Sequence, residues 1–288
     1  MRLFLLGVPS DVDSVSRALS PMPLVNWTEA GILKQTADEV APLLRILPFQ
    51  ELWIACDISG LKKLHQEEFV MGIAGSSLTL ANATIRRQSD RTLDIGTGCG
   101  IQAFMASRHS EQVSTIDRDP RAIDIARFNA KLNDLENVEF FEGDLFEPVR
   151  GRKFNLIVSN PPFVISPEFR AHYRDGGLGG DELCQQIVRK APEFLDDGGF
   201  CQILCNWLQK AGIDWRERWA GWFKDCGCDV WVMRGNSMDP SEYTMSWNKE
   251  EAGNSGFGKT YRNWMAYFER EQVESIGVGL ITMRRTSG

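Results

Sequence analysis

Two short stretches of the sequence combine residue types that could bind a small polar ligand and position a second group beside it. LDIGTGCG, residues 93–100, places Asp94 ahead of glycines at alternate positions, which are Gly96, Gly98 and Gly100. Glycines leave backbone N–H groups uncovered where a strand turns into a helix, and such a helix N-terminus suits the polar part of a nucleotide-like ligand. SNPPF, residues 159–163, then places an asparagine ahead of two prolines.

The spacing of the glycines separates the classes of nucleotide site. The dinucleotide fingerprint GxGxxG, begun at Gly96 and Gly98, requires its third glycine at position 101, which is Ile101. The P-loop pattern GxxxxGK[ST] does not occur in the sequence. A nicotinamide-dependent dehydrogenase is therefore disfavoured, and what remains is an acidic residue followed by GxGxG.

That remaining pattern resembles the S-adenosylmethionine loop of class I methyltransferases. The resemblance implies further acidic residues after the next two strands. Asp117, 23 residues after Asp94, fits the residue that binds the ribose hydroxyls, and Asp144 fits the one near the adenine amine. The implied cofactor is S-adenosyl-L-methionine, with S-adenosyl-L-homocysteine as product. The other residues that the resemblance assigns to cofactor binding are Thr97, Arg118, Leu145 through its backbone, and Asn160.

The NPPF string follows a predicted strand, FNLIVS, at the edge of the sheet where ligands bind. Pro161 and Pro162 cannot continue a central strand, because neither donates a ladder hydrogen bond. A plain strand terminator would explain the prolines but neither Asn160 nor Phe163. The Asn160 side-chain oxygen and the Pro161 carbonyl could accept both N–H groups of a planar amine, so that catalysis is mostly positioning. Phe163 would stack on that planar group, a contact worth about 1–3 kcal/mol when the partner is a base.

Together, residues 94–100 and 160–163 resemble the [ND]PP[YF] methyltransferases, which include release-factor glutamine enzymes, N2-guanine ribosomal RNA enzymes and N6-adenine enzymes. The stretch Tyr173–Gly199 is similar to the glutamine enzymes, which often carry a comparable glycine- and acid-rich stretch. The resemblance covers about residues 90–205. The full chain looks most like bacterial HemK-like proteins of the methyltransferase small group whose substrate is unassigned.

The methyl acceptor stays open between several classes. The sequence favours a macromolecule, with a protein glutamine amide slightly ahead of an N2-guanine or N6-adenine in RNA. Residues 89–205 carry 13 basic and 19 acidic side chains, a net charge of −6, which is a poor footprint for a large nucleic-acid surface. The phenylalanine of NPPF, in place of the tyrosine of NPPY, instead favours guanine or adenine as the acceptor. A small-molecule methyltransferase and a non-catalytic cofactor-binding subunit are the further alternatives.

The elements that must position these residues alternate between strands and helices from about Thr92 to Met283. The predicted strands are TLDIG, VSTID, VEFFEGD, FNLIVSN, FCQILCN, GCDVWVMRG and IGVGLITMRR. The predicted helices are GIQAFMASRHS, PRAIDIARFNAKLND, DELCQQIVRKAPEFL and TYRNWMAYFEREQV. Repeated βαβ units imply a parallel sheet covered on both faces. Residues 89–288 are therefore predicted to form an α/β, doubly wound, mostly parallel, seven-stranded Rossmann-like methyltransferase domain.

Residues 1–88 predict a small N-terminal α+β domain, with a winged-helix-like arrangement as one interpretation. VDSVSRALS and WTEAGILKQT predict short helices, and LLRILPFQELWIACD predicts two strands around Pro48. Such a domain would recruit substrate over the site or serve as a scaffold against the core. Residues 234–260 are polar and predict a long loop, either a substrate loop or an insertion.

The composition, 43% hydrophobic and 25% charged residues, is that of an ordinary globular protein. No apolar run approaches the roughly 18 residues of a membrane span, and the first residues are not apolar enough for a secretory segment. Met1 could be an internal cut of a longer protein. The seven cysteines form no CxxC pair. Reduced thiols, a cytoplasmic location, no membrane partner and no metal are therefore predicted.

Overall fold

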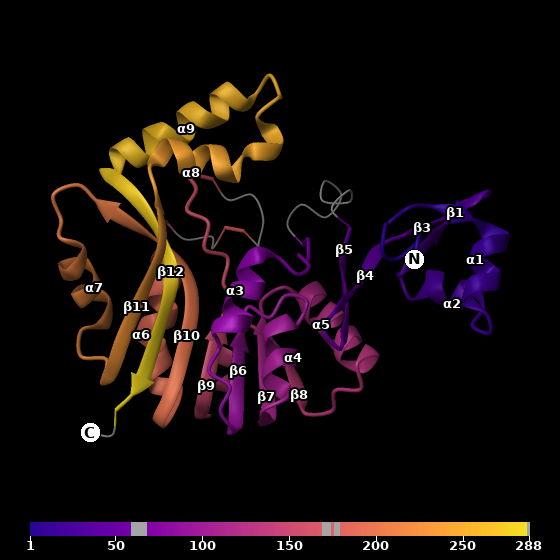
Figure 1. Cartoon of the computed structure of the whole chain (residues 1–288), viewed down its shortest axis with the longest axis horizontal. Helices are drawn as coiled ribbons and strands as arrows, with labels where there is room; N and C mark the ends of the chain where they lie inside the picture. Colours follow the sequence, from indigo (N-terminus) through magenta and orange to yellow (C-terminus); the bar gives the residue numbers. More distant parts are fainter. Residues whose placement is uncertain (59–67, 169–173, 176–178, 287–288) are drawn as a thin grey trace.

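The computed structural model describes residues 1–58, 68–168, 174–175 and 179–286. Within them, the largest sheet has seven strands in the order β11-β12-β10-β9-β6-β7-β8 (Figure 1). The strands are β6 (Ser89–Ile95), β7 (Ser110–Asp117), β8 (Val138–Glu142), β9 (Phe154–Ser159), β10 (Leu195–Lys210), β11 (Cys228–Met238) and β12 (Val273–Arg285). The pairs from β10 through β8 are parallel, whereas β12 runs antiparallel to both neighbours. The predicted doubly wound, mostly parallel α/β sheet is confirmed.

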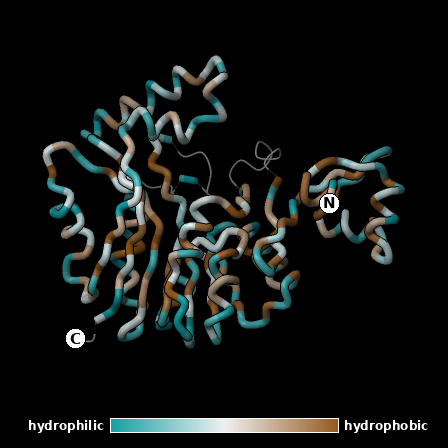
Figure 2. Tube along the Cα trace, viewed as in Figure 1, coloured by the Kyte–Doolittle hydropathy of each residue, from teal (hydrophilic) through white to brown (hydrophobic). Residues whose placement is uncertain are grey.

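Helices cover both faces of this sheet. They are α3 (Gly75–Ala83), α4 (Ile101–Ser107), α5 (Pro120–Leu132), α6 (Glu182–Lys190), α7 (Trp215–Phe223), α8 (Pro240–Trp247) and α9 (Phe257–Arg270). Alternate residues of β9 point to opposite faces: Ile157 packs with residues of α6 and α7, while Leu156 and Val158 pack with Leu80 of α3. Figure 2 shows hydrophobic residues concentrated along the strands of the sheet. The core therefore lies on both sides of the strands that carry the predicted site.

The second crossover helix begins as its sequence predicts. Asp119 accepts a hydrogen bond from the backbone N–H of Arg121 at 2.9 Å, and Pro120 occupies the first turn of α5. Ile123 and Ala126 are buried along the inner side of that helix. This start fixes α5 directly after β7, so that the β7–α5 turn lies at the carboxyl edge of the sheet.

The N-terminal residues form a small lobe beside the sheet, drawn in indigo in Figure 1. Its three-stranded sheet has the order β1-β3-β2, and the β4–β5 hairpin follows. The elements are β1 (Ser10–Asp11), α1 (Val12–Leu19), α2 (Leu24–Glu29), β2 (Leu33–Gln35), β3 (Glu39–Pro42), β4 (Leu44–Phe49) and β5 (Leu52–Asp57). The predicted first helix and the two strands near Pro48 are confirmed. The winged-helix interpretation and the boundary at 88/89 stay predictions.

The helix predicted over residues 27–36 is wrong in its second half. Helix α2 ends at Glu29, and Gly31 adopts a left-handed φ of +67°, a conformation that stops a helix at little cost for glycine. The following residues, 33–35, form β2 instead. The glycine and the β-branched residue after it outweigh the helical pattern.

The long loop predicted over residues 234–260 is also wrong. Strand β11 continues to Met238, α8 follows at once, a 3-10 helix covers Lys249–Glu251, and α9 begins at Phe257. The Asp239 side chain accepts from the N–H of Glu242 at 2.8 Å and caps α8, and Tyr243 is fully buried beneath it. In Figure 1 the two helices lie above the upper ends of β10 and β12.

Strand β10 extends beyond the predicted FCQILCN at both ends and includes Trp207. The Trp207 side chain is buried, and a Cβ atom added at Gly277 of β12 would lie 2.3 Å from its Cε2. The glycine on the neighbouring strand thus makes room for the indole ring. Trp207 is a packing residue of the sheet.

Among the described helices, none is both long enough and apolar enough to cross a membrane.

Candidate active site

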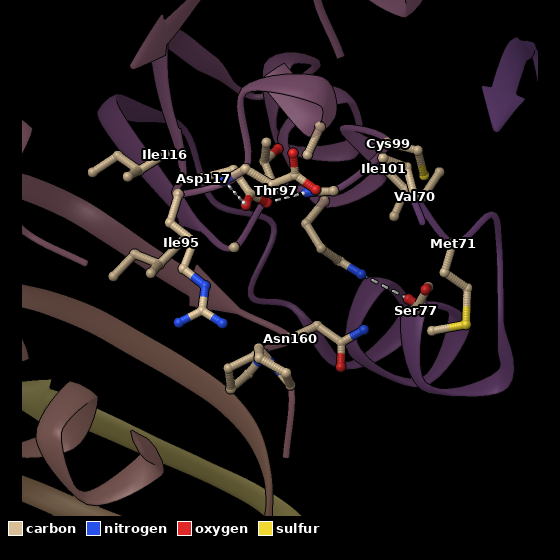
Figure 3. Close-up of a pocket in the computed structure, with 18 of the residues that line it drawn as sticks. Val70, Met71, Ser77, Ile95, Thr97, Cys99, Ile101, Ile116, Asp117 and Asn160 are labelled. Carbon is tan, nitrogen blue, oxygen red and sulfur yellow. Dashed lines mark hydrogen bonds between the residues drawn. The ribbon is translucent and has the colours of Figure 1, made fainter. Parts of the chain in front are cut away.

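A cavity of about 140 Å³ lies at the carboxyl ends of β6, β7, β8 and β9 (Figure 3). Two sets of residues line it. The strand-end wall consists of the loops that follow the strands, at 95–99, 116–119, 143–145 and 160–162. The N-terminal wall consists of residues 69–72 together with Ser77 of α3. The remaining lining comes from helices: Ile101 and Gln102 of α4, Ala122 of α5, and Leu183 and Ile187 of α6.

Most of the residues predicted from the sequence meet in this cavity. Those that line it are Gly96, Thr97, Gly98, Asp117, Arg118, Asp144, Leu145, Asn160, Pro161 and Pro162. Three predicted residues, Asp94, Gly100 and Phe163, do not line it. The first group surrounds a ligand-sized space, and the second has structural contacts that are described below.

The glycine loop is shaped by two close contacts. Gly98 has a φ of +53°, and its N–H donates to Oδ2 of Asp117 at 2.9 Å. Gly100 has a φ of +92°, and a Cβ atom added there would lie 2.2 Å from the Phe104 ring. A side chain at position 100 would therefore displace a buried ring of α4. Gly100 shapes the loop from behind and leaves the cavity lining to Gly96 and Gly98.

Asp94 lies beneath the loop and is fully buried. Its Oδ2 accepts from the Thr97 hydroxyl at 2.8 Å and from the N–H of Ala103 at 3.2 Å, whereas its Oδ1 has no hydrogen-bond partner among the described residues. Burial raises the pKa of this carboxyl to about 7, because desolvation outweighs the two hydrogen bonds. Asp94 joins the glycine loop to the first turn of α4.

Asp117 lies at the end of β7 and faces the cavity, as Figure 3 shows. Its two oxygens accept from the backbone N–H groups of Gly98 and Asp119 at 2.9 and 3.0 Å. Burial raises the pKa of Asp117, and the nearby Asp119 carboxyl raises it further. A carboxylate held this way can still accept hydrogen bonds from ligand hydroxyls through its remaining lone pairs.

Asp144 and Leu145 follow β8 in a strained turn. Leu145 adopts a left-handed φ of +46°, a conformation that costs a non-glycine residue about 1–3 kcal/mol. The Asp144 carbonyl accepts from the N–H of Glu147 at 3.0 Å, which closes the turn. Such strain is typical of ligand sites, where it fixes the direction of a backbone group.

Asn160 directly follows β9, and Ser159 ties that strand end to β6 by donating from its hydroxyl to the Ile95 carbonyl at 2.9 Å. The Asn160 Nδ2 donates to the hydroxyl of Ser76 at 3.2 Å. Its Oδ1 is buried and has no hydrogen-bond partner among the described residues. A polar acceptor is therefore available at the cavity, next to Pro161 and Pro162.

Phe163 packs away from the cavity lining. Its ring meets that of Trp247 in α8 edge-on, with centroids 6.3 Å apart and an interplanar angle of 74°. The predicted stacking of Phe163 on an acceptor stays a prediction. Part of the glycine- and acid-rich stretch that follows, residues 173 and 176–178, lies outside the described residues.

The sequence motifs missed the N-terminal wall. Asp57 at the end of β5 accepts from the N–H of Val70 at 2.8 Å and pairs with Arg121 of α5 through a buried ion pair. Asn129 of α5 binds both backbone groups of Ala55, at 2.7 and 2.8 Å. These contacts place residues 69–72 against the strand-end loops. No local sequence pattern indicates these contacts, because Asp57 and Arg121 lie 64 residues apart and Ala55 and Asn129 lie 74 residues apart.

Among the described residues, no group of three or more histidine, cysteine, aspartate or glutamate side chains could hold a metal ion. The cysteines found there are free thiols. The acidic side chains at the cavity instead accept hydrogen bonds from backbone N–H groups.

Comparisons with known proteins agree on one family. The model of the methyltransferase small domain matches residues 73–213. A Methanocaldococcus jannaschii protein, whose description proposes protein N5-glutamine methyltransferase activity, is 36% identical over 156 residues, which cover 51% of this chain and 77% of that protein. A release factor glutamine methyltransferase from Geobacter sulfurreducens is 36% identical over 163 residues, covering 52% of this chain and 54% of the relative.

The chain thus spans about half the length of the Geobacter relative and about three quarters of the length of the Methanocaldococcus relative. Among solved structures, the YcgJ protein from Bacillus subtilis superposes with a TM-score of 0.51 at 15% identity, over 74% of this chain and 99% of that one. A likeness at that identity concerns the fold. The match of the family model, residues 73–213, contains the strand-end wall of the cavity.

Proposed function

The chain belongs to the methyltransferase small domain family, and we propose that it transfers the methyl group of S-adenosylmethionine to a planar nitrogen, most favourably the side-chain amide of a protein glutamine. The family and the fold agree with those predicted from the sequence. Methyl transfer is the class of reaction that this family performs. The cofactor, the acceptor and the roles of single residues are the proposal.

The residues around the cavity fit S-adenosylmethionine. Asp117 would hold the ribose hydroxyls, the backbone of Gly96–Gly98 would hold the amino-acid part, and the strained Asp144–Leu145 turn would meet the adenine. The buried carboxyls of Asp94 and Asp117 suit a ligand with positive charge, because a nearby cation offsets their desolvation. When bound, the cofactor would supply a methyl group carried on a sulfonium sulfur. As the methyl group moves to the acceptor nitrogen, the sulfur would become a thioether and the nitrogen would lose a proton.

The observation that carries the proposal is the unpartnered Oδ1 of Asn160. A buried acceptor without a partner costs about 1–3 kcal/mol, so a site that keeps one is prepared for a donor from a ligand. An N–H of the acceptor amide would bind Oδ1, and the Pro161 carbonyl would bind the other N–H. The nitrogen is then held in one place and orientation, which by itself lowers the barrier to transfer.

A protein glutamine is supported as acceptor by two observations. Both described relatives carry names that refer to glutamine methylation. The acidic balance of residues 89–205 suits a protein partner better than a nucleic acid. We therefore propose a protein acceptor and, with it, a cytoplasmic location.

An RNA base is the second acceptor class, since it also offers a planar amine. The stacking surface that a base would use is Phe163, whose ring packs against Trp247 and not along the cavity. That arrangement favours the smaller amide group over a base. A labelling experiment can distinguish a protein acceptor from an RNA acceptor directly.

The test uses tritium-labelled S-adenosylmethionine and an extract of cells that lack the protein. Label that disappears after protease treatment supports the glutamine proposal, and label that disappears after RNase supports the base. Asn160→Ala serves as the inactive reference. Cofactor binding without any transfer would contradict the proposal and favour a non-catalytic cofactor-binding subunit.

A further inference from the structure

The amide of Asn160 has two chemically opposite ends, and its orientation decides what it can do to an acceptor. The oxygen end accepts a hydrogen bond from an N–H group, and the nitrogen end repels one. In the structure the nitrogen end is occupied, because Nδ2 donates to the Ser76 hydroxyl at 3.2 Å. We infer that Ser76 is a positioning residue of the methyl-transfer site, which holds the Asn160 amide so that Oδ1 remains for the acceptor. This inference rests on the proposed function.

Ser76 itself is held firmly. It lies in the first turn of α3, where the carbonyl of the next residue, Ser77, accepts from Nε2 of Gln102 at 2.8 Å. Gln102 is buried and belongs to α4, the helix that follows the glycine loop. The start of α3 is therefore fixed relative to the loop proposed to bind the cofactor, and Figure 3 shows Ser77 and Asn160 at the same cavity.

The other end of α3 is anchored to the strand that carries Asn160. Leu80 is fully buried and packs with Leu156 and Val158 of β9. Because α3 contacts α4 and β10 and shares a buried cluster with β9, the first turn of α3 and the backbone of Asn160 belong to one packed unit. The hydrogen bond from the Asn160 Nδ2 to the Ser76 hydroxyl therefore costs little conformational entropy, since both backbones are already in place.

The polarity of the pair matches a nitrogen acceptor. If the amide turned over, Nδ2 would face the cavity and an incoming N–H group would meet a second donor. Donor against donor is repulsive, and both would be left without partners at the cost of a buried unsatisfied group. A hydroxyl at position 76 can bond either end of the amide, but only the bond from Nδ2 leaves Oδ1 for the acceptor, so Ser76 and the incoming N–H together stabilise the productive orientation. An alanine there would leave the amide free to turn.

The test compares Ser76→Ala with two further variants. Ser76→Thr keeps the hydroxyl and is expected to keep the function. Thr79→Val removes a hydroxyl from the exposed side of the same helix, where it bonds only to the Gly75 carbonyl among the described residues, and serves as the matched control. Alanine and serine are both tolerated in helices, with alanine the more favourable, so Ser76→Ala should fold.

The first readout does not depend on transfer. Asparagine side chains are labelled with ¹⁵N, and NMR spectra are recorded on protein saturated with S-adenosylhomocysteine. The two side-chain N–H signals of Asn160, the Asn160 pair, are assigned by their loss in Asn160→Ala. Ser76→Ala should shift that pair and speed its hydrogen exchange, while Ser76→Thr and Thr79→Val leave it near its original position. An unchanged Asn160 pair in Ser76→Ala would overturn the inference.

The second readout is the initial rate at which label is transferred from S-adenosylmethionine to protein in the extract of cells that lack this protein. Ser76→Ala should lower this rate about three- to tenfold, the value of one neutral hydrogen bond, with S-adenosylhomocysteine affinity unchanged. Ser76→Thr should restore the rate to within about twofold. If the native protein transfers nothing while its Asn160 pair still responds to Ser76→Ala, the proposed function fails and the positioning contact stands.

Discussion

The two walls of the cavity are held in place by different kinds of interaction. In the strand-end wall, backbone bonds between neighbouring strand ends add to those of the Asp94 and Asp117 carboxyls. The N–H of Gly96 donates to the Ile116 carbonyl at 2.9 Å, and that of Gly143 donates to the Asp117 carbonyl at 3.0 Å. The N-terminal wall belongs to no strand of the large sheet. One backbone bond, from the Asp57 N–H to the Val70 carbonyl at 3.1 Å, holds it together with side chains, chiefly Asp57 on the N–H of Val70 and Gln102 on the Ser77 carbonyl.

This difference suggests separate roles for the two walls: the strand-end wall carries the reacting side chains, and the N-terminal wall encloses the cavity. Backbone contacts between parallel strands survive most side-chain substitutions, so part of the shape of the strand-end wall is independent of its side chains. The N-terminal wall depends on a few side chains, so single substitutions there should move it. Changes in the first wall should alter transfer or affinity, and changes in the second should alter affinity together with stability.

The largest effect is expected from Asn160→Ala in the strand-end wall. Losing a hydrogen-bond acceptor for the reacting nitrogen should lower the rate of transfer about 100- to 1,000-fold. Affinity for S-adenosylhomocysteine, measured by calorimetry, should stay within about twofold, because the product needs no acceptor at that position. Full activity of Asn160→Ala would refute the role given to the NPPF residues.

Asp117→Ala should act on the same wall through affinity. The carboxylate would bind cofactor hydroxyls from a buried position, and a hydrogen bond to a charged group is worth about 1.5–3 kcal/mol. Cofactor affinity should fall about 10- to 100-fold, as calorimetry would measure. An unchanged dissociation constant would remove Asp117 from the ribose role, whatever happened to the rate.

The strand-end wall was predictable from the sequence because its residues follow strands at short, regular spacings. Asp94, Gly96, Gly98 and Asp117 lie in or directly after apolar stretches that predict strands on their own. Parallel strands bring all such ends to one edge of the sheet. Local patterns therefore predicted both the elements and their meeting point.

The N-terminal wall was not predictable in the same way, since its contacts join distant residues. Asp57 and Arg121 are 64 residues apart, and no local pattern marks either as a partner. Helix α8 is a different case. The Asp239–Pro240 pair is a local helix start, but the polar composition of the following residues concealed it.

Asp57→Asn tests whether side chains hold the N-terminal wall. An asparagine oxygen can still accept from Val70, but the charged pair with Arg121 is lost from a site where the Asp57 side chain is fully buried. Unfolding free energy should fall by about 1–3 kcal/mol in urea titrations. Cofactor affinity should fall about three- to tenfold, because residues 69–72 line the cavity.

Arg127→Gln is the matched control on the same helix. Its ion pair with Asp124 joins two exposed side chains at 3.5 Å, and such pairs contribute about 0–1 kcal/mol. Stability and affinity should both stay close to those of the native protein. Equal losses in Asp57→Asn and Arg127→Gln would show that the buried pair has no special part in closing the cavity.

The buried carboxyls of the strand-end wall should also make stability and affinity depend on pH. Burial raises the pKa of Asp94 to about 7, well above its usual 3.8, and it raises that of Asp117 as well. The ligand-free native state therefore keeps protons that the unfolded chain has already lost. Its stability should fall as the pH rises from about 4 to about 7, because the native state binds more protons in that window.

A cationic cofactor should reverse that trend, since it favours the ionised carboxylates. Affinity for S-adenosylmethionine should rise between pH 6 and pH 8, by at most about tenfold for each pH unit that one group titrates. Melting curves at pH 5–8 with and without the cofactor measure both slopes. Asp94→Asn should flatten them. Equal slopes in native protein and Asp94→Asn would leave the dependence to Asp117 and detach Asp94 from the charge of the ligand.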